Sequence, residues 1–120
     1  MSSVRYTTES GELVARDCRS GELLHKYSFE VPIRQFIPKV EFGGCVVLLD
    51  ARVSDKPTFE NLFMIRADGT NIWSAKLPES HDAFVNVVDQ GATIVAHTWR
   101  GHLLEIDVAT GRTMSDHFTK

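Results

Sequence analysis

Short apolar segments alternate with glycine-containing turns along the whole chain. The segments are rich in Val, Ile, Leu, Phe, Trp and Thr, the residues that suit a pleated strand. No window of helical length places its apolar residues on one clean helical face. The pattern therefore predicts an all-β, antiparallel protein. We expect strands at residues 4–8, 12–17, 22–30, 34–42, 45–52, 60–67, 71–77, 83–89, 93–99, 102–107 and 112–118.

Two hairpins carry recognisable turn residues. Asp68-Gly69 and Arg100-Gly101 each predict a two-residue turn, because glycine adopts the positive φ angles that such turns need. A two-residue turn at Arg100-Gly101 sets the register of the hairpin that the strands at 93–99 and 102–107 form. In that register, one face carries Val95, His97, Trp99, His102, Leu104 and Ile106. Both faces of this hairpin are substantially apolar, which indicates packing on both sides.

The chain repeats itself. A shift of 90 positions aligns residues 4–24 with residues 94–114 without a gap. The identical pairs are Thr8/Thr98, Gly11/Gly101, Leu13/Leu103, Asp17/Asp107 and Gly21/Gly111. A weaker third copy covers residues 62–73, and its turn glycine, Gly69, follows Gly21 by 48 positions and precedes Gly111 by 42. A period of about 45 residues that holds four strands is typical of a propeller blade.

The turn segments of the three copies resemble the blade repeats of quinoprotein-type (PQQ-like) β-propellers. These segments are residues 17–21, 67–73 and 107–111. In that family a tryptophan four positions after the glycine docks against the neighbouring blade; Trp73 has this place, and His25 and Ser115 replace it in the other copies. The quinone-binding and calcium-binding residues of quinoproteins have no counterpart that we can match. The resemblance therefore implies an architecture and no cofactor.

The aspartates at these turns have a structural interpretation. Asp17, Asp68 and Asp107 precede the turn glycines, where a carboxylate can accept hydrogen bonds from backbone amides two residues further on. We expect them to stabilise turns rather than to act as acid or base catalysts.

The number of strands leaves a propeller incomplete. We expect one domain, residues 1–120, with internal repeats at about 4–30, 34–77 and 83–118, which is about two and a half four-stranded units. Closed propellers typically contain four to eight blades. Either several chains complete a ring, or the chain is an open antiparallel sheet whose unpaired edges and uncovered faces attract partners.

Composition and charge exclude several classes of protein. A chain of 120 residues and 13.5 kDa suits one domain. Thirteen basic and sixteen acidic residues give a net charge of −3, which argues against a nucleic-acid partner. The longest apolar run, residues 46–49, is too short to span a membrane. Residues 1–6 lack a signal-peptide pattern, so we expect a cytoplasmic protein with Cys18 and Cys45 as reduced thiols.

No residue pattern indicates catalysis. Ser80-His81-Asp82 contains the residue types of a hydrolase triad, but three consecutive residues cannot adopt its geometry. His97 and His102 could share a face, yet no carboxylate is expected to converge on them to form a metal site. Glycines are scattered and form no phosphate-binding loop. We therefore expect no enzyme activity, no catalytic residues, no metal and no cofactor.

Two functional hypotheses remain. The first is a non-catalytic protein-binding module, for example a bacterial immunity-type inhibitor that neutralises a toxin domain. It would bind through exposed residues of loop 78–82 and nearby acids, namely Glu79, His81, Asp82 and Asp89. The alternative is a propeller that is completed by homo-oligomerisation and binds a small ligand or sugar through His97, Trp99 and His102.

Overall fold

The computed structural model describes residues 4–118, which contain eleven strands and two short 3-10 helices. The strands are β1 (Val4–Glu9), β2 (Glu12–Asp17), β3 (Leu23–Tyr27), β4 (Ile33–Lys39), β5 (Gly44–Leu49), β6 (Leu62–Arg66), β7 (Asn71–Ser74), β8 (Phe84–Asp89), β9 (Thr93–Thr98), β10 (His102–Asp107) and β11 (Thr113–Phe118). The helices are η1 (Val40–Phe42) and η2 (Ala51–Val53). No helix within residues 4–118 is long and apolar enough to cross a bilayer.

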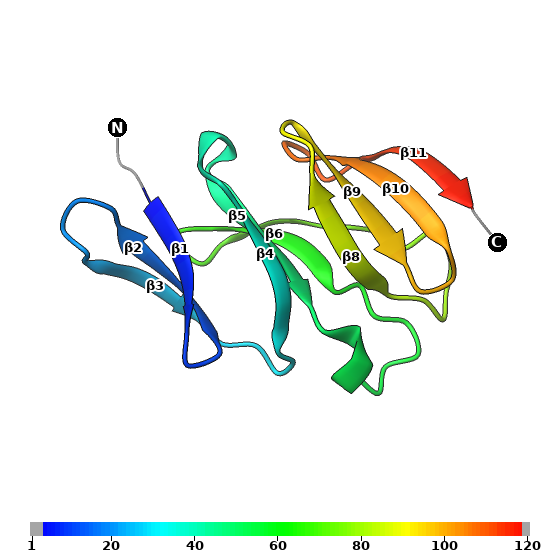
Figure 1. The fold of residues 1–120 in the computed structure, drawn as a ribbon, viewed down its shortest axis with the longest axis horizontal. Coiled ribbons are helices and arrows are strands. Elements are labelled where there is room, and N and C mark those ends of the chain that lie inside the picture. The colour runs from blue at the N-terminus through cyan, green and yellow to red at the C-terminus, as the bar shows by residue number, and fades with distance from the viewer. Residues whose placement is uncertain (1–3, 119–120) are drawn as a thin grey trace.

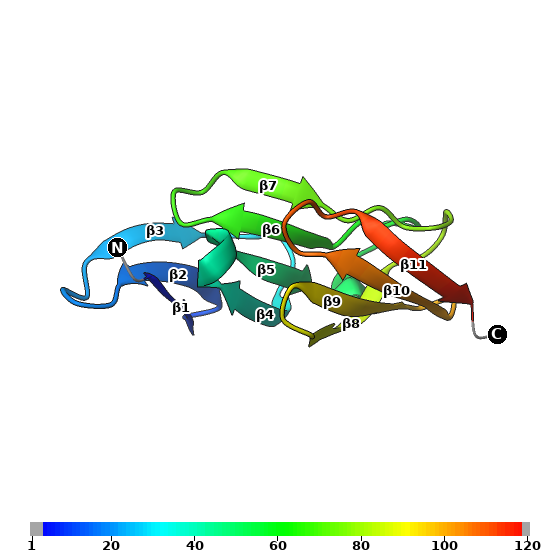
Figure 2. The same ribbon diagram turned by 90° about the horizontal axis from the view of Figure 1, so that it is seen from above.

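The strands form three antiparallel sheets in chain order (Figure 1). Sheet 1 is β1-β2-β3, sheet 2 is β4-β5-β6-β7 and sheet 3 is β8-β9-β10-β11. Seen from above, β4 and β8 lie along one side of the molecule and β7 and β11 along the other (Figure 2). The prediction of an all-β, antiparallel fold with blade-like units is confirmed. Each predicted strand has a counterpart, although the strand predicted at 34–42 ends at Lys39 and continues as η1.

Sheet 2 lies between two apolar cores because its strands are apolar on both faces. Every residue of β5 is buried. Val46 and Leu48 face sheet 3, whereas Cys45 and Val47 face sheet 1. The continuous apolar run at residues 46–49 is therefore that of a strand covered on both faces.

The register of the β9–β10 hairpin differs from the prediction by one residue. Leu103 lies opposite His97, and Glu105 lies opposite Val95. The turn holds three residues, 99–101, rather than two, and the Thr98 hydroxyl accepts a hydrogen bond from the His102 amide (3.0 Å). A shift of one residue exchanges the two faces of a strand. The core face is therefore formed by Ile94, Ala96, Thr98, Leu104 and Ile106. The β6–β7 turn is also longer than predicted and spans residues 67–70.

Aromatic side chains join one sheet to the turn of the next. The Trp73 indole N–H donates to the Val108 carbonyl (2.7 Å), and a Cβ at Gly111 would lie 2.5 Å from the Trp73 ring. His25 of sheet 1 has the same relation to Gly69, where a Cβ would lie 2.6 Å from its Nε2. The docking of Trp73 that the resemblance implied is confirmed. These glycines are required because any side chain would displace the ring.

The outer face of sheet 1 offers no such contact. No heavy atom of the neighbouring elements described lies within 4 Å of a Cβ built at Gly21. Arg16 donates two hydrogen bonds of 3.1 Å to Glu9 between β2 and β1. The ion pairs Glu9–Arg16 and Glu12–Lys26 therefore place charged side chains on sheet 1.

The turn aspartates have the structural role that their positions predicted. Asp17 Oδ1 accepts from the amides of Arg19 (2.8 Å) and Ser20 (3.0 Å), and Asp68 Oδ1 accepts from Thr70 (2.9 Å). The Ser20 and Arg19 amides hold the pKa of Asp17 below its usual value. Asp107 instead accepts from the Thr110 hydroxyl (2.7 Å).

Polar side chains tie sheet 2 to sheet 3. The fully buried Asn61 donates to the carbonyls of Leu49 and Phe84 (both 2.7 Å) and accepts from the Phe84 amide (2.9 Å). Gln35 binds the amide and the carbonyl of Val87 in the same manner (2.9 Å each). These side chains satisfy backbone groups between β-sheets that no strand pairing reaches.

The two cysteines are free, and they differ in accessibility: Cys18 is exposed and Cys45 is buried. Burial raises the pKa of the Cys45 thiol to about 12, so at about pH 8 it stays neutral and unreactive. Iodoacetamide is therefore expected to label Cys18 alone in the native protein, and both thiols after denaturation. Intact-mass spectrometry measures the number of labels; two labels on native protein would contradict the burial of Cys45.

Candidate functional site

A cavity of about 520 Å³ opens between sheets 2 and 3, where η2, the β7–β8 loop and the β9–β10 turn meet. The Phe59 amide donates to the Asp82 carbonyl (3.0 Å), and Phe59 pairs with Ala83, so the β5–β6 connection is held beside the start of β8. The wall combines cationic and aromatic side chains, namely Arg34, Arg52, Lys56, Phe59 and Trp99.

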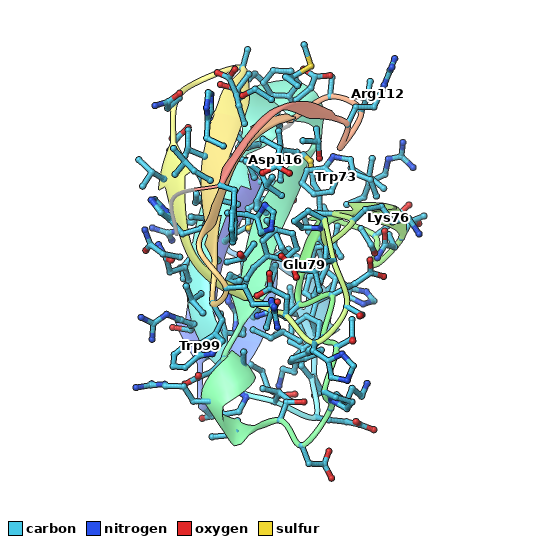
Figure 3. The ribbon with its side chains drawn as sticks, turned by 90° about the vertical axis from the view of Figure 1, so that its right-hand side faces the viewer. Trp73, Lys76, Glu79, Trp99, Arg112 and Asp116 are labelled. Carbon is cyan, nitrogen blue, oxygen red and sulfur yellow. The ribbon has the colours of Figure 1, made fainter. Side chains whose placement is uncertain are left out.

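Trp99 lies at this cavity and is 72% exposed. Its backbone amide donates to the Ala83 carbonyl (2.9 Å), which holds the β9–β10 turn against β8. In the end view of Figure 3, Trp99 lies at the lower left, apart from Glu79 and Asp116. An exposed side chain of this size is typical of an interaction surface.

Two of the cations that line the cavity with Trp99 have partners within this chain. Arg52 pairs with Asp50 (2.8 Å), which also accepts from the Arg52 amide and begins η2. These hydrogen bonds lower the pKa of Asp50 to about 2. Lys56 lies 5.4 Å from the centre of the Phe59 ring, a cation–π distance.

A second polar group gathers around His102 on the core-facing side of β10. Its Nε2 lies 2.6 Å from Glu79 Oε2, and its Nδ1 lies 2.8 Å from Asp116 Oδ1. Arg100 Nε pairs with the other oxygen of Glu79 (2.8 Å). The Asp116 carboxylate, together with Glu79, holds the pKa of His102 above its usual value, because only the imidazolium can donate to both.

Asp82 borders both the cavity and the His102 group. It is 3% exposed, and its Oδ1 accepts from the amides of Ala83 (2.8 Å) and Arg100 (3.0 Å). Its Oδ2 is buried without a hydrogen-bond partner among residues 4–118. Donor atoms of Glu79, Asp82 and His102 all lie within 4.8 Å of one another.

The four predicted partner-binding residues do not form one exposed surface. The expectation that Asp82 is exposed is wrong, because its carboxylate binds the backbone of the β9–β10 turn. Glu79 faces Arg100 and His102. Asp89 lies at the far end of β8 from Phe84, where it binds the buried amine of Lys39. His81 is exposed in the β7–β8 loop with φ +57°.

The predicted ligand-binding residues are also separated. His97 lies on the outer face of sheet 3 beside Leu103, and His102 lies on the opposite face. Trp99 lies in the turn between them. The expectation that no carboxylate converges on the histidines is wrong for His102. The missing signal was the β10–β11 register, which pairs Leu104 with Asp116 and so brings Asp116 to the face of His102.

Comparisons with solved structures define the class of this fold. The β-propeller domain of Cps50 (Swd1) from Myceliophteria thermophila matches with a TM-score of 0.67 at 15% identity, over 97% of this chain and 38% of that chain. The computationally designed protein Ika8 matches with a TM-score of 0.64 at 17% identity, over 98% and 33%. BamB from Moraxella catarrhalis matches with a TM-score of 0.56 at 16% identity, over 97% and 33%. The chain therefore has the fold of β-propeller blades and spans about a third of each of these chains.

The sequence itself assigns the family. A family model matches residues 24–118, and the chain belongs to the family described as Domain of unknown function (DUF7957). The comparison with curated proteins gave no match.

Proposed function

We propose that this protein is a non-catalytic protein-binding module whose contact surface is the loop end of sheets 2 and 3. The observation that carries the proposal is Trp99, which is 72% exposed beside a cavity of about 520 Å³. Tryptophan and arginine are the residues that most often dominate the binding energy of an interface. Arg52 and Arg100, with side chains 75% and 49% exposed, flank the same surface.

The charged side chains at the cavity indicate the chemistry of the partner. Arg34, Arg52 and Lys56 line the cavity together with Asp50, which pairs with Arg52, whereas the nearby acids Asp82 and Glu79 are bound to groups of this chain. A partner that inserts an apolar side chain and surrounds it with carboxylates would complement this surface. Inhibition of a bacterial toxin is a finer form of the proposal; the small size of the chain supports it, and an acidic region of such a toxin would face Trp99.

Two finer proposals concern lineage and compartment. The docking of Trp73 onto Gly111 supports a relation to quinoprotein-type blades, as the turn sequences suggested. The free thiols of Cys18 and Cys45 support a cytoplasmic location.

A small anionic ligand is the second candidate occupant of the surface. The cavity volume of about 520 Å³ lies within the usual range of small-molecule sites, and its cationic wall suits a carboxylate or a phosphate. Completion of the propeller by several copies of this chain would accompany this alternative. Light scattering with size exclusion separates the two: a stable symmetric oligomer supports the ligand-binding form, and a monomer supports the protein-binding module.

The Trp99→Ala variant tests the proposal. We expect affinity for a purified partner to fall about 30-fold or more, the loss of a hot-spot side chain, with an unchanged circular dichroism spectrum. Val88→Ala is the matched control, because Val88 is an exposed apolar residue (45%) elsewhere on sheet 3; it should leave affinity unchanged. Equal affinities of Trp99→Ala and the native protein in titration calorimetry would exclude this surface.

A further inference from the structure

Three potential metal ligands, from two separate parts of the chain, converge between sheets 2 and 3. Glu79 and Asp82 belong to the β7–β8 loop, and His102 begins β10. One donor atom from each lies within 4.8 Å of the others. Donors around a tetrahedral ion with bonds of about 2.1 Å lie roughly 3.4 Å apart, so small side-chain movements bring the three into a coordination sphere. We propose that Glu79, Asp82 and His102 bind a divalent transition-metal ion of the zinc class.

The Asp82 carboxylate supplies an observation that is independent of the clustering. Two backbone amides fix its Oδ1, while its buried Oδ2 has no hydrogen-bond partner among the residues described. A buried carboxylate oxygen without a partner is costly. A cation at the centre of the cluster supplies the missing partner. Because the backbone positions Asp82, this ligand is preorganised, and the other two need only close upon it.

The surroundings of His102 match a metal-binding histidine. A ligating imidazole commonly donates its second N–H to a carboxylate, which fixes the tautomer. Asp116 Oδ1 lies 2.8 Å from Nδ1 in that position, and an ion at Nε2 would take the place of the proton that Nε2 now directs at Glu79, releasing that proton to solvent. The His102 side chain is 11% exposed, so the protein rather than solvent determines its orientation.

Glu79 can ligate an ion while it keeps its pair with Arg100. Its Oε1 accepts from Arg100 Nε (2.8 Å), and its Oε2 faces His102 Nε2 (2.6 Å). An ion between Oε2 and Nε2 would bind Glu79 through one oxygen, and Arg100 would hold the other. One imidazole nitrogen and two carboxylate oxygens favour Zn²⁺ or a neighbouring first-row ion over Ca²⁺ or Mg²⁺, which prefer oxygen donors alone.

Titration of chelator-treated protein with ZnCl₂ in a calorimeter tests the site. We expect saturable binding of one ion per chain at micromolar concentration, and Co²⁺ in its place should give the visible absorption of a four-coordinate site. Asp82→Asn keeps an oxygen for the two amides and removes the anionic ligand, so binding should weaken at least about 100-fold. Asp116→Asn should weaken binding by about 10- to 100-fold. His97→Gln is the matched control, because His97 lies on the opposite face of sheet 3.

A measurement on the native sequence guards against variants that fail to fold. Zinc should shift the Nε2 resonance of His102 in a nitrogen-15 NMR spectrum and leave those of His97 and His117 in place. Absence of saturable binding at micromolar zinc, equal affinity of Asp82→Asn and the native protein, or a shift at His97 instead of His102 would each overturn the proposal.

Discussion

Replacement of Trp73 with alanine is expected to lower the free energy of unfolding by about 3–5 kcal/mol. The side chain is 8% exposed, packs in the core between sheets 2 and 3, and donates to the Val108 carbonyl. Its removal leaves a cavity above Gly111 and an unpaired buried carbonyl. Urea denaturation followed by circular dichroism measures the change.

His25→Ala is the matched control for Trp73→Ala, because His25 contacts Gly69 as Trp73 contacts Gly111. The smaller, only partly buried ring of His25 should cost about 1 kcal/mol. Trp73→Phe keeps an aromatic ring without the N–H donor and should give an intermediate loss. A larger loss of unfolding free energy in His25→Ala than in Trp73→Ala would show that Trp73 is not the main contact between neighbouring sheets.

Asn61→Leu is expected to destabilise the protein by about 3 kcal/mol or more, since each buried backbone group that loses its partner costs about 1–3 kcal/mol. The groups are the Phe84 amide and the carbonyls of Phe84 and Leu49. Leucine has the same branched skeleton of four heavy atoms and leaves no cavity, so the loss includes the hydrogen bonds and no cavity term. Denaturation gives the free energy, and hydrogen exchange at the Phe84 amide should accelerate.

Gln35→Leu serves as the control for Asn61→Leu. Gln35 makes the equivalent pair of bonds to Val87 but is only partly buried, so water replaces its amide group and the loss should be smaller. Unchanged exchange at Phe84 in Asn61→Leu would contradict the role of Asn61 as a link between sheets.

Sequence patterns predicted the strands because the alternation of apolar and polar residues, and the residues of each turn, can be recognised within a short segment of the chain. The glycine repeat located equivalent turns, and Trp73 marked the contact between two sheets. The register of β9–β10 was not predictable in this way. Arg100-Gly101 suggested two turn residues, but the turn also includes Trp99, and Thr98 accepts the hydrogen bond that closes it. A change of one residue transferred His97 to the other face.

The candidate sites depend on long-range geometry that no local pattern contains. Glu79 meets His102 only because the β7–β8 loop passes the start of β10, and Asp116 joins them only through the β10–β11 register. The acidic loop was therefore interpreted as a solvated surface, although Asp82 is buried. Trp99 is exposed because it belongs to the three-residue turn, whereas the sequence pattern had placed it at the end of a strand.

The contact between an aromatic ring and a turn glycine also bears on self-assembly. It joins unlike surfaces, so a series of such contacts closes into a ring where the rotation between sheets allows it and builds a filament where it does not. At one end of the molecule Gly21 could receive a ring, but the equivalent residue at the other end is Ser115, which is too small to fill that place. The contact between an aromatic ring and a turn glycine thus joins sheet 1 to sheet 2 and sheet 2 to sheet 3, and Ser115 offers no ring that would repeat it on a further sheet.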